Sequence, residues 1–282
     1  MIYIIWVDLL ISFRFANLNK CKMKYTLNLN LRFILIACVM GLVITQESCS
    51  KETATPIQAS SGKLIGNIQT WDDKTVSTND AGGISISLNN LTGFSNNSTT
   101  DASGKFLFEN LPFDVYDMII SKAGYGTLKV FGISHTSSSS SLFTLLPTIS
   151  FGKNSTTSVS AFSVAGNSFN GIPGVSFNYG LNPTPSSSSR AFIRYFFSTT
   201  PDVSSTNYVA YSSLYNFSSL SNVAGFTSND LIGMGFSIGQ TVYVRMYGDS
   251  FKANDFTDPN TNKREFPNIN SNTTAAVSFI VL

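Results

Sequence analysis

Short segments in which apolar and polar residues alternate recur along this chain, and they limit its fold more than any other feature. Ile84, Ile86 and Leu88 are separated by single serines, so their side chains would share one face of an extended strand. Similar segments are predicted over residues 62–69, 105–108, 115–122, 127–131, 174–178, 191–198, 208–212, 241–247 and 275–282. Because these segments are short and Gly, Asn, Asp or Ser lie between them, the pattern predicts an all-β chain of β-sandwiches.

A few segments between these strands carry other local signals. Residues 228–233 (SNDLIG) predict a helical turn with Ser228 or Asn229 as its N-cap. The pairs Asn89-Asn90 and Asn96-Asn97 predict turns, and residues 263–265 (KRE) predict a solvated turn.

The length of 282 residues is enough for two ordinary domains after an N-terminal leader. We predict a leader over residues 1–48, with Met23 as the natural start, and a polar tether over residues 49–61. The first β-sandwich is predicted over residues 62–148 and the second over residues 149–282. Residues 1–22 are either an over-extended reading frame or part of a longer leader.

The leader contains an uncharged apolar run of 13 residues over 33–45 (FILIACVMGLVIT), preceded by Lys24 and Arg32. A membrane-spanning helix needs about 20 apolar residues, so this run fits the apolar region of a secretory signal peptide. The alternative is an uncleaved N-terminal anchor. In either case the sequence predicts a protein outside the inner membrane.

The run ends at Cys49, which follows the small residue Ser48 and precedes Ser50-Lys51-Glu52. This arrangement resembles a bacterial lipoprotein signal, in which the cysteine is lipidated and becomes the first residue. The start Cys-Ser-Lys-acidic is similar to that of surface lipoproteins of polysaccharide-degrading Gram-negative bacteria. The resemblance implies that Cys49 is lipidated and that this lipid anchors the protein to a membrane. It also implies that this membrane is the outer membrane and that the protein faces the cell surface.

Residues 100–112 (TDASGKFLFENLP) combine a turn with a strand. Asp101 and Gly104 suit a tight hairpin, and Phe106 and Phe108 would face the core. Tyr116 would bury its ring and hydrogen-bond its hydroxyl.

With Val115-Tyr116 and Ala123-Gly124-Tyr125, this motif resembles the carboxypeptidase regulatory-like domain, a transthyretin-like sandwich of seven strands. The resemblance implies a carbohydrate-binding-like fold and no peptidase activity. In the second domain, the pattern Val-Tyr-Val-Arg-x-Tyr over residues 242–247 resembles a fibronectin-type-III-like sandwich. There the segment 241–247 would be a late central strand, and 275–282 the last one.

Charge and residue usage exclude several classes of function. Residues 49–282 carry 13 basic and 14 acidic residues, without the basic stripe of a nucleic-acid binder. Residues 50–282 contain no cysteine, and His135 is the single histidine, so neither a thiolate metal site nor a Ser-His-Asp triad is predicted. The acids lie in predicted turns, so we expect no enzyme and no cofactor.

Two stretches carry the candidate ligand-binding residues. Trp71 stands beside Asp72 and Asp73, a pattern with which sandwich domains hold a sugar ring, although a partly buried Trp near a turn gives the same pattern. Tyr247 and Asp249 open a loop rich in acids and amides. We therefore predict Trp71, Tyr247 and Asp249 as ligand-binding residues.

The same loop contains a weak candidate for a calcium site. Asp249, Asp255 and Asp258, with Asn260 and Asn262, supply the oxygen ligands that this cation prefers. The spacing is not that of an EF-hand, and Asp and Asn are also ordinary loop residues.

Together these features predict a non-catalytic cell-envelope lipoprotein that acts as a binding or assembly module, with carbohydrate as the leading ligand. The alternative is a structural spacer or protein-partner module of the outer membrane, without a small-molecule ligand.

Overall fold

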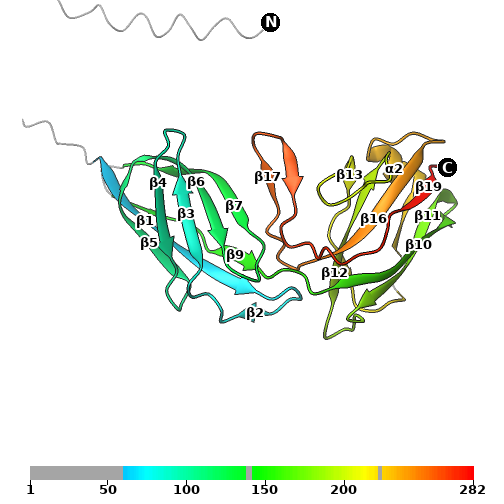
Figure 1. Cartoon of the computed structure of the whole chain (residues 1–282), viewed down its shortest axis with the longest axis horizontal. Helices are drawn as coiled ribbons and strands as arrows, with labels where there is room; N and C mark the ends of the chain where they lie inside the picture. The colour runs from blue at the N-terminus through cyan, green and yellow to red at the C-terminus, as the bar shows by residue number, and fades with distance from the viewer. Residues whose placement is uncertain (1–59, 138–141, 222–223) are drawn as a thin grey trace, which may run out of the picture. The chain divides into compact units, whose positions relative to one another are not determined.

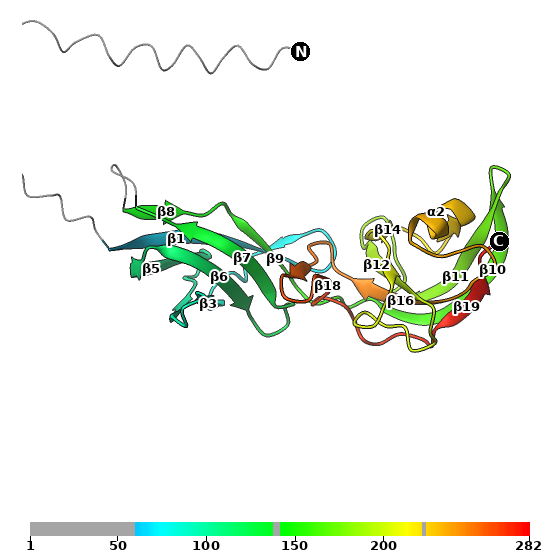
Figure 2. The same ribbon diagram turned by 90° about the horizontal axis from the view of Figure 1, so that it is seen from above.

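The computed structural model describes residues 60–137, 142–221 and 224–282. The predicted leader, Cys49 and nearly all of the tether lie outside the described residues. Residues Gln58–Leu282 form one compact unit, in which the strands form two β-sandwiches (Figures 1 and 2). The predicted all-β fold of two sandwiches is confirmed.

The first sandwich consists of two sheets. In one, β1 pairs with β2, β5, β8 and β9, and in the other the order is β4-β3-β6-β7. The strands are β1 (Ser61–Trp71), β2 (Ser77–Thr78), β3 (Ser85–Asn89), β4 (Ser95–Thr99), β5 (Lys105–Pro112), β6 (Asp114–Ser121), β7 (Leu128–His135), β8 (Phe143–Leu145) and β9 (Ile149–Gly152).

The local predictions for this sandwich agree with its core. Phe106 and Phe108 point inward from β5. They belong to the same buried cluster as Ile84, Ile86 and Leu88, which come from the other sheet. Gly104 has a φ of 88°, and the Asp101 carboxylate accepts hydrogen bonds from the backbone of Ser103 and Lys105. Tyr116 is fully buried and its hydroxyl donates to the Pro112 carbonyl at 2.8 Å. The turn and the core positions were therefore encoded locally.

Two details differ from the predictions. Asn96 and Asn97 do not form a turn but lie within β4, an edge strand with no buried residue, where polar side chains face solvent. The first sandwich also extends past the predicted limit at residue 148. Strand β9 pairs in parallel with Ile68–Trp71 of β1. This register sets Phe151 opposite Thr70, which is buried, so Phe151 enters the first core.

The second sandwich packs a three-stranded sheet, β10-β11-β15, against a larger one in the order β13-β12-β16-β19, with β14 also on β12. Its elements are β10 (Ser158–Phe169), β11 (Ile172–Asn182), β12 (Ala191–Ser198), β13 (Ala210–Tyr211), β14 (Tyr215–Phe217), β15 (Ala224–Thr227), the helix α2 (Ser228–Gly233), β16 (Thr241–Asp249) and β19 (Val277–Ile280). A separate hairpin joins β17 (Phe256–Asp258) to β18 (Lys263–Glu265).

Strand β12 lies at the centre of this sandwich, and all eight of its residues are buried. The predicted central strand over 241–247 is β16, which pairs with β12 on one side and β19 on the other. Residues 263–265 form strand β18 and not a turn, because they pair with β17. Helix α2 begins after Thr227, whose side chain and that of Asp230 form a capping box. The predicted cap, Ser228 or Asn229, was therefore one or two residues late.

Buried amides connect the two sandwiches. The Asn254 side chain accepts from the Gly152 amide at 2.9 Å and donates to the Gly126 carbonyl at 2.5 Å. Asn268 donates to the carbonyls of Gly152 and Lys153 at 2.8 and 2.9 Å. Both amides are buried, so water cannot reach the backbone groups around them. These bonds give those groups the hydrogen-bond partners that they would otherwise lack.

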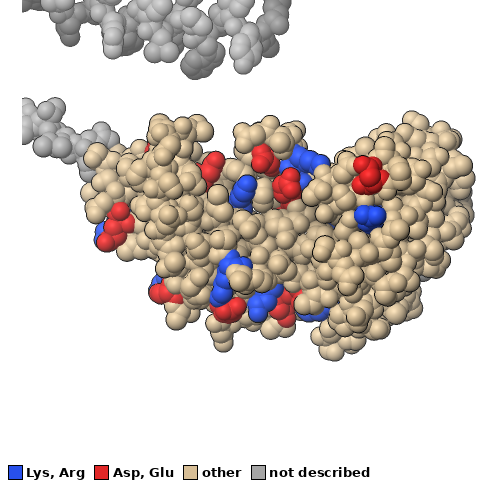
Figure 3. Space-filling view, viewed as in Figure 1, with Lys and Arg blue, Asp and Glu red and all other residues tan. Residues whose placement is uncertain are grey.

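Charged side chains are sparse on the face drawn in Figure 3, where uncharged surface separates small groups of both signs. No helix among the described residues is long and apolar enough to cross a membrane.

Candidate functional site

A buried ion pair joins the two central strands of the second sandwich. Arg194 on β12 and Asp249 at the end of β16 are 5% and 1% exposed, and their side chains meet at 2.9 Å. Arg194 also donates to the Ser212 carbonyl at 3.1 Å. Burial raises the pKa of Asp249, although the Arg194 guanidinium opposes this by favouring the charged carboxylate.

A second acid and a second arginine continue this row toward the surface. Asp255 lies 4.0 Å from Arg194 and accepts from Arg264 Nε and Nη2 at 3.0 and 2.8 Å. We call Asp249, Arg194, Asp255 and Arg264 the charge ladder. Each acid faces a guanidinium, so the ladder is internally neutralised and holds Arg264 in one position.

The weak prediction of calcium at Asp249, Asp255 and Asp258 is therefore not supported by the geometry. The first two acids are occupied by arginines, and Asp258 accepts from the backbone of Asn260 and Thr261 in the β17–β18 turn. Among the described residues, no cluster of three His, Cys, Asp or Glu side chains could hold a metal ion.

The outer end of the charge ladder borders a groove of about 600 Å³. One wall is the segment that leads into β13, and the other is the β17–β18 hairpin. The lining residues are Tyr208, Val209, Tyr211, Thr257, Thr261, Asn262, Lys263 and Arg264. We call this the tyrosine groove, because two aromatic rings stand among amide, hydroxyl and cationic groups.

The rings of the tyrosine groove are held by packing below it. Tyr211 keeps 39% of its surface exposed, while its ring meets Tyr208 and Phe266 edge to face, with centroids 5.5 and 5.0 Å apart. The Arg194 guanidinium lies 6.0 Å from the centre of the Tyr211 ring. Tyr208 donates its hydroxyl to the Arg264 carbonyl at 2.7 Å. Tyr211 is thus an exposed ring whose position is fixed by its neighbours.

Polar side chains line the tyrosine groove beside its two rings. The Lys263 ammonium lies 4.9 Å from the centre of the Tyr208 ring and donates to the Thr206 carbonyl. Arg264 Nη1 donates to the Thr257 hydroxyl at 3.3 Å. A fixed aromatic surface beside hydroxyl and amide groups is suited to a ligand with both apolar and hydrogen-bonding faces.

The residues predicted from the sequence lie elsewhere. Tyr247 is 5% exposed and packs edge to face on Phe196 in the core, so it has no free surface for a sugar ring. Trp71, at the end of β1, is half-buried, and its ring lies 5.6 Å from that of Phe251. The Lys252 ammonium is 5.2 Å from the centre of the Trp71 ring. Asp249 is enclosed in the charge ladder.

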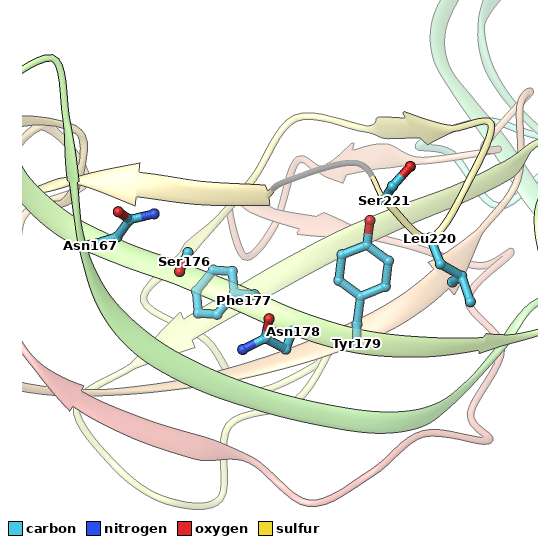
Figure 4. A pocket seen from close by; sticks show the side chains of 7 residues that line it. All are labelled: Asn167, Ser176, Phe177, Asn178, Tyr179, Leu220 and Ser221. Carbon is cyan, nitrogen blue, oxygen red and sulfur yellow. The ribbon is translucent and has the colours of Figure 1, made fainter.

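Two other hollows fit a ligand less well. The hollow of Figure 4, of about 330 Å³, contains Tyr179, but that ring stacks on Phe217 at 4.8 Å, and Phe177 beside it belongs to the core. Another, of about 390 Å³, lies on the first sandwich and includes Ile65, Leu107 and Lys105. Neither combines an exposed aromatic ring with several polar groups.

The sequence predicts a strand over residues 208–212, and it did not single out Tyr208 or Tyr211 as groove residues. A weak signal was present, since two tyrosines three residues apart flank the short segment Val209-Ala210. Nothing in the sequence, however, indicates that this segment meets the hairpin 256–265 some fifty residues later.

No protein-family model matches the chain, and no curated protein matches it. Among solved structures, a type II cohesin–X-dockerin complex from Acetivibrio cellulolyticus is 22% identical with a TM-score of 0.26, over 32% of this chain and 57% of that one. A DUF3823 family protein from Bacteroides ovatus is 13% identical with a TM-score of 0.26, over 79% of this chain and all of that one. The full-length major pilin SpaD from Corynebacterium diphtheriae is 13% identical with a TM-score of 0.28, over 78% and 67%. The chain thus spans less than two thirds of the cohesin–dockerin chain that it matches.

Proposed function

We propose that this protein is a non-catalytic, lipid-anchored cell-envelope protein whose tyrosine groove binds a glycan. The observation that carries the proposal is the exposed, fixed ring of Tyr211 among the hydroxyl, amide and cationic groups of the β17–β18 hairpin. A sugar ring has an apolar C–H face and a rim of hydroxyls, so it needs both kinds of group in one place.

In the proposed complex, the C–H face of one sugar packs on Tyr211. Its hydroxyls exchange hydrogen bonds with Thr261 and Asn262, and Lys263 donates to a ring or hydroxyl oxygen. The charge ladder contributes by holding the groove open in the unbound state, which lowers the conformational entropy lost on binding. Because Asp249 and Asp255 are paired with arginines, neither is placed as a general acid or nucleophile.

The test is glycan-array binding of residues 50–282, followed by calorimetry with the best glycan. We expect Tyr211→Ala to weaken binding by about tenfold, which corresponds to about 1.4 kcal/mol. Phe143→Ala is the matched control, since Phe143 is an exposed aromatic on the first sandwich, 55% exposed and outside the groove. Equal binding by wild type and Tyr211→Ala would remove the groove from the proposal.

The proposed anchor is the lipidated Cys49, which would place the protein at the outer membrane, facing the cell surface. The support is the sequence around Ser48-Cys49 and the absence of any later cysteine. Metabolic labelling with an alkyne fatty acid tests it, with Cys49→Ala as the comparison. Label on the wild type alone supports the anchor, and label on neither disproves it. Protease shaving of intact cells then reports the leaflet.

We also propose that the first sandwich belongs to the carboxypeptidase regulatory-like group and the second to the fibronectin-type-III-like group. The Asp101–Gly104 hairpin and the buried Tyr116 support the first assignment. The packing of a three-stranded sheet on a larger sheet, with β16 central and β19 at the edge, supports the second.

A structural spacer is the second candidate, favoured by the buried amides Asn254 and Asn268 that join the sandwiches. A spacer needs this junction and not the groove. In cells, loss of function in Asn268→Ala with normal function in Tyr211→Ala would favour the spacer, and the reverse pattern would favour glycan binding.

A further inference from the structure

The outer face of the first sandwich carries an apolar row that crosses three strands. In the register of the sheet, Ile65 on β1 stands opposite Leu107 on β5 and opposite Leu145 on β8. One row further toward the start of β1, Lys63 stands opposite Phe143. We call Leu107, Ile65, Leu145 and Phe143 the apolar stripe.

The stripe points away from the core. Alternation along β1 turns Leu64 fully inward, so Ile65 faces outward and is half-buried between its neighbours. Leu107 is 42%, Phe143 55% and Leu145 69% exposed. Four neighbouring apolar side chains on one sheet face form a continuous surface, which is different from the scattered exposed residues that most proteins carry.

The stripe lies next to the point where the chain enters the first sandwich. Strand β1 begins at Ser61, and the carbonyl of Ser60 accepts from the Phe113 amide at 3.2 Å. The Lys63 amide donates to the Leu142 carbonyl at 2.8 Å, which ties the segment before β8 to the same end of β1. Leu142 is itself exposed. Thus strand pairing places the apolar side chains beside Lys63 and Ile65, within a few residues of the start of β1, where the proposed tether ends.

A short tether limits how far this end can move from a membrane. Ten residues lie between Cys49 and Ser60, and a fully extended chain spans at most about 3.6 Å per residue step, or about 40 Å over these eleven steps. A surface held that close to a bilayer has a high effective concentration for it, so weak apolar contact is enough for docking. The charges beside the stripe are of both signs: Lys63 and Glu109 form an exposed pair at 2.7 Å, and Lys105 and Asp101 line the hollow beside Ile65 and Leu107. Their charges sum to zero, so they do not repel an anionic lipid surface.

From this placement, we propose that the apolar stripe rests on the lipid surface to which the protein is anchored, with Phe143 and Leu145 in the interfacial region. This inference rests on the proposed lipid anchor and deepens it. It assigns the first sandwich the role of fixing the orientation of the molecule. When the first sandwich is docked on the membrane, it no longer rotates freely about its anchor. The second sandwich, with the tyrosine groove, then keeps a fixed orientation relative to the membrane.

The experiment supplies the anchor artificially, so that it does not depend on Cys49. Residues 50–282 with an N-terminal histidine tag are bound to vesicles of phosphatidylethanolamine and phosphatidylglycerol that contain a small share of nickel-chelating lipid. This part of the chain has no cysteine, so Leu145→Cys introduces a single site for an environment-sensitive NBD fluorophore. Ile238→Cys is the matched control, since Ile238 is 71% exposed on the second sandwich.

On vesicles, we expect the probe at position 145 to emit at shorter wavelength and to be several-fold less accessible to iodide quenching. The probe at position 238 should remain as it is in solution. Adding Phe143→Ser should reverse much of the change at position 145. Water-like emission at both positions would overturn the proposal. A blue shift at position 145 without vesicles would also overturn it, because it would mean that a second copy of the chain covers the stripe.

The two proposals can fail separately. If fatty-acid labelling at Cys49 fails while the probe at position 145 enters the bilayer, the natural anchor is wrong but the lipid-docking surface remains. If labelling succeeds while the probe stays in water, the anchor stands and the docking surface does not.

Discussion

The first sandwich packs aromatic and aliphatic side chains in its core and buries the ring of His135, whereas the second packs a larger connected set of aromatic rings and buries the Arg194–Asp249 pair. Phe177 and Tyr195 are typical of the second core, where their ring centroids lie 5.0 Å apart in a stacked arrangement. In the first core, the alternating residues of β3 are fully buried and form no polar contacts. The first sandwich therefore satisfies its buried polar side chains with hydrogen bonds, such as that between His135 and Thr144, while the second also buries an ion pair that supports a surface groove.

The largest effect should come from breaking the buried pair. Arg194→Met leaves Asp249 without its partner in a buried position, so we expect the free energy of unfolding to fall by about 3–5 kcal/mol. Urea unfolding of residues 50–282 measures this. The double variant Arg194→Met with Asp249→Leu should regain most of the loss. Lys63→Met, which breaks the exposed pair of the first sandwich, is the control, with an expected change of less than about 1 kcal/mol.

A smaller effect should distinguish the two cores through one hydroxyl group each. The Tyr116 hydroxyl donates to Pro112, so Tyr116→Phe should lower the free energy of unfolding by about 1 kcal/mol. The Tyr195 hydroxyl is buried and has no partner among the described residues, so Tyr195→Phe should raise it by about 1 kcal/mol. Thermal unfolding of the two variants gives the signs. Destabilisation by Tyr195→Phe would mean that its hydroxyl is satisfied.

The smallest effect should be a pH dependence from His135. Its Nε2 faces the Leu111 carbonyl at 3.3 Å and must carry the proton there, so Nδ1 accepts from the Thr144 hydroxyl at 2.7 Å in the neutral ring. Burial lowers the pKa of His135 below its ordinary value of 6.5. As the pH falls through 6.5, the unfolded chain binds a proton before the folded one, so stability decreases until the folded pKa is reached.

Unfolding free energies measured between pH 7.5 and pH 5 test this, with His135→Gln as the variant that should flatten the profile. The raised pKa of Asp249 changes the free energy of unfolding in the opposite direction. Its carboxyl binds a proton more readily in the folded chain than in the unfolded one, so this group makes the fold more stable as the pH falls toward 3.8. A wild-type profile as flat as that of His135→Gln would show that the ring of His135 is not shielded from water.

Several features of the fold could be predicted because they are encoded over a few residues. Alternation located β3 and β16, an aromatic-rich run located β12, and Asp101 with Gly104 located a hairpin. The prediction failed where local chemistry was ambiguous. Asn96 and Asn97 suit a turn, but they also suit a solvent-facing edge strand such as β4. Strand β10, rich in Ser and with few large apolar residues, has too little apolar alternation to be recognised.

The candidate site was predicted less well. Tyr247 and Asp249 share a polar stretch of sequence, but one faces the core and the other faces Arg194. Tyr211 was the better candidate, because it alone among the tyrosines of the described residues is both in a groove and substantially exposed. Exposure depends on what packs beside a residue, and this chain places those neighbours far away in sequence.

The sequence by itself determined the all-β class, the tight hairpin and the inward residues of β3 and β5, because the period of two and the turn residues act between near neighbours. Only the tertiary structure decided which acids meet arginines, which tyrosine is exposed and which outward residues align across β5, β1 and β8. Those outcomes depend on strand pairing and register, and pairing joins segments tens of residues apart whose partners no local pattern specifies.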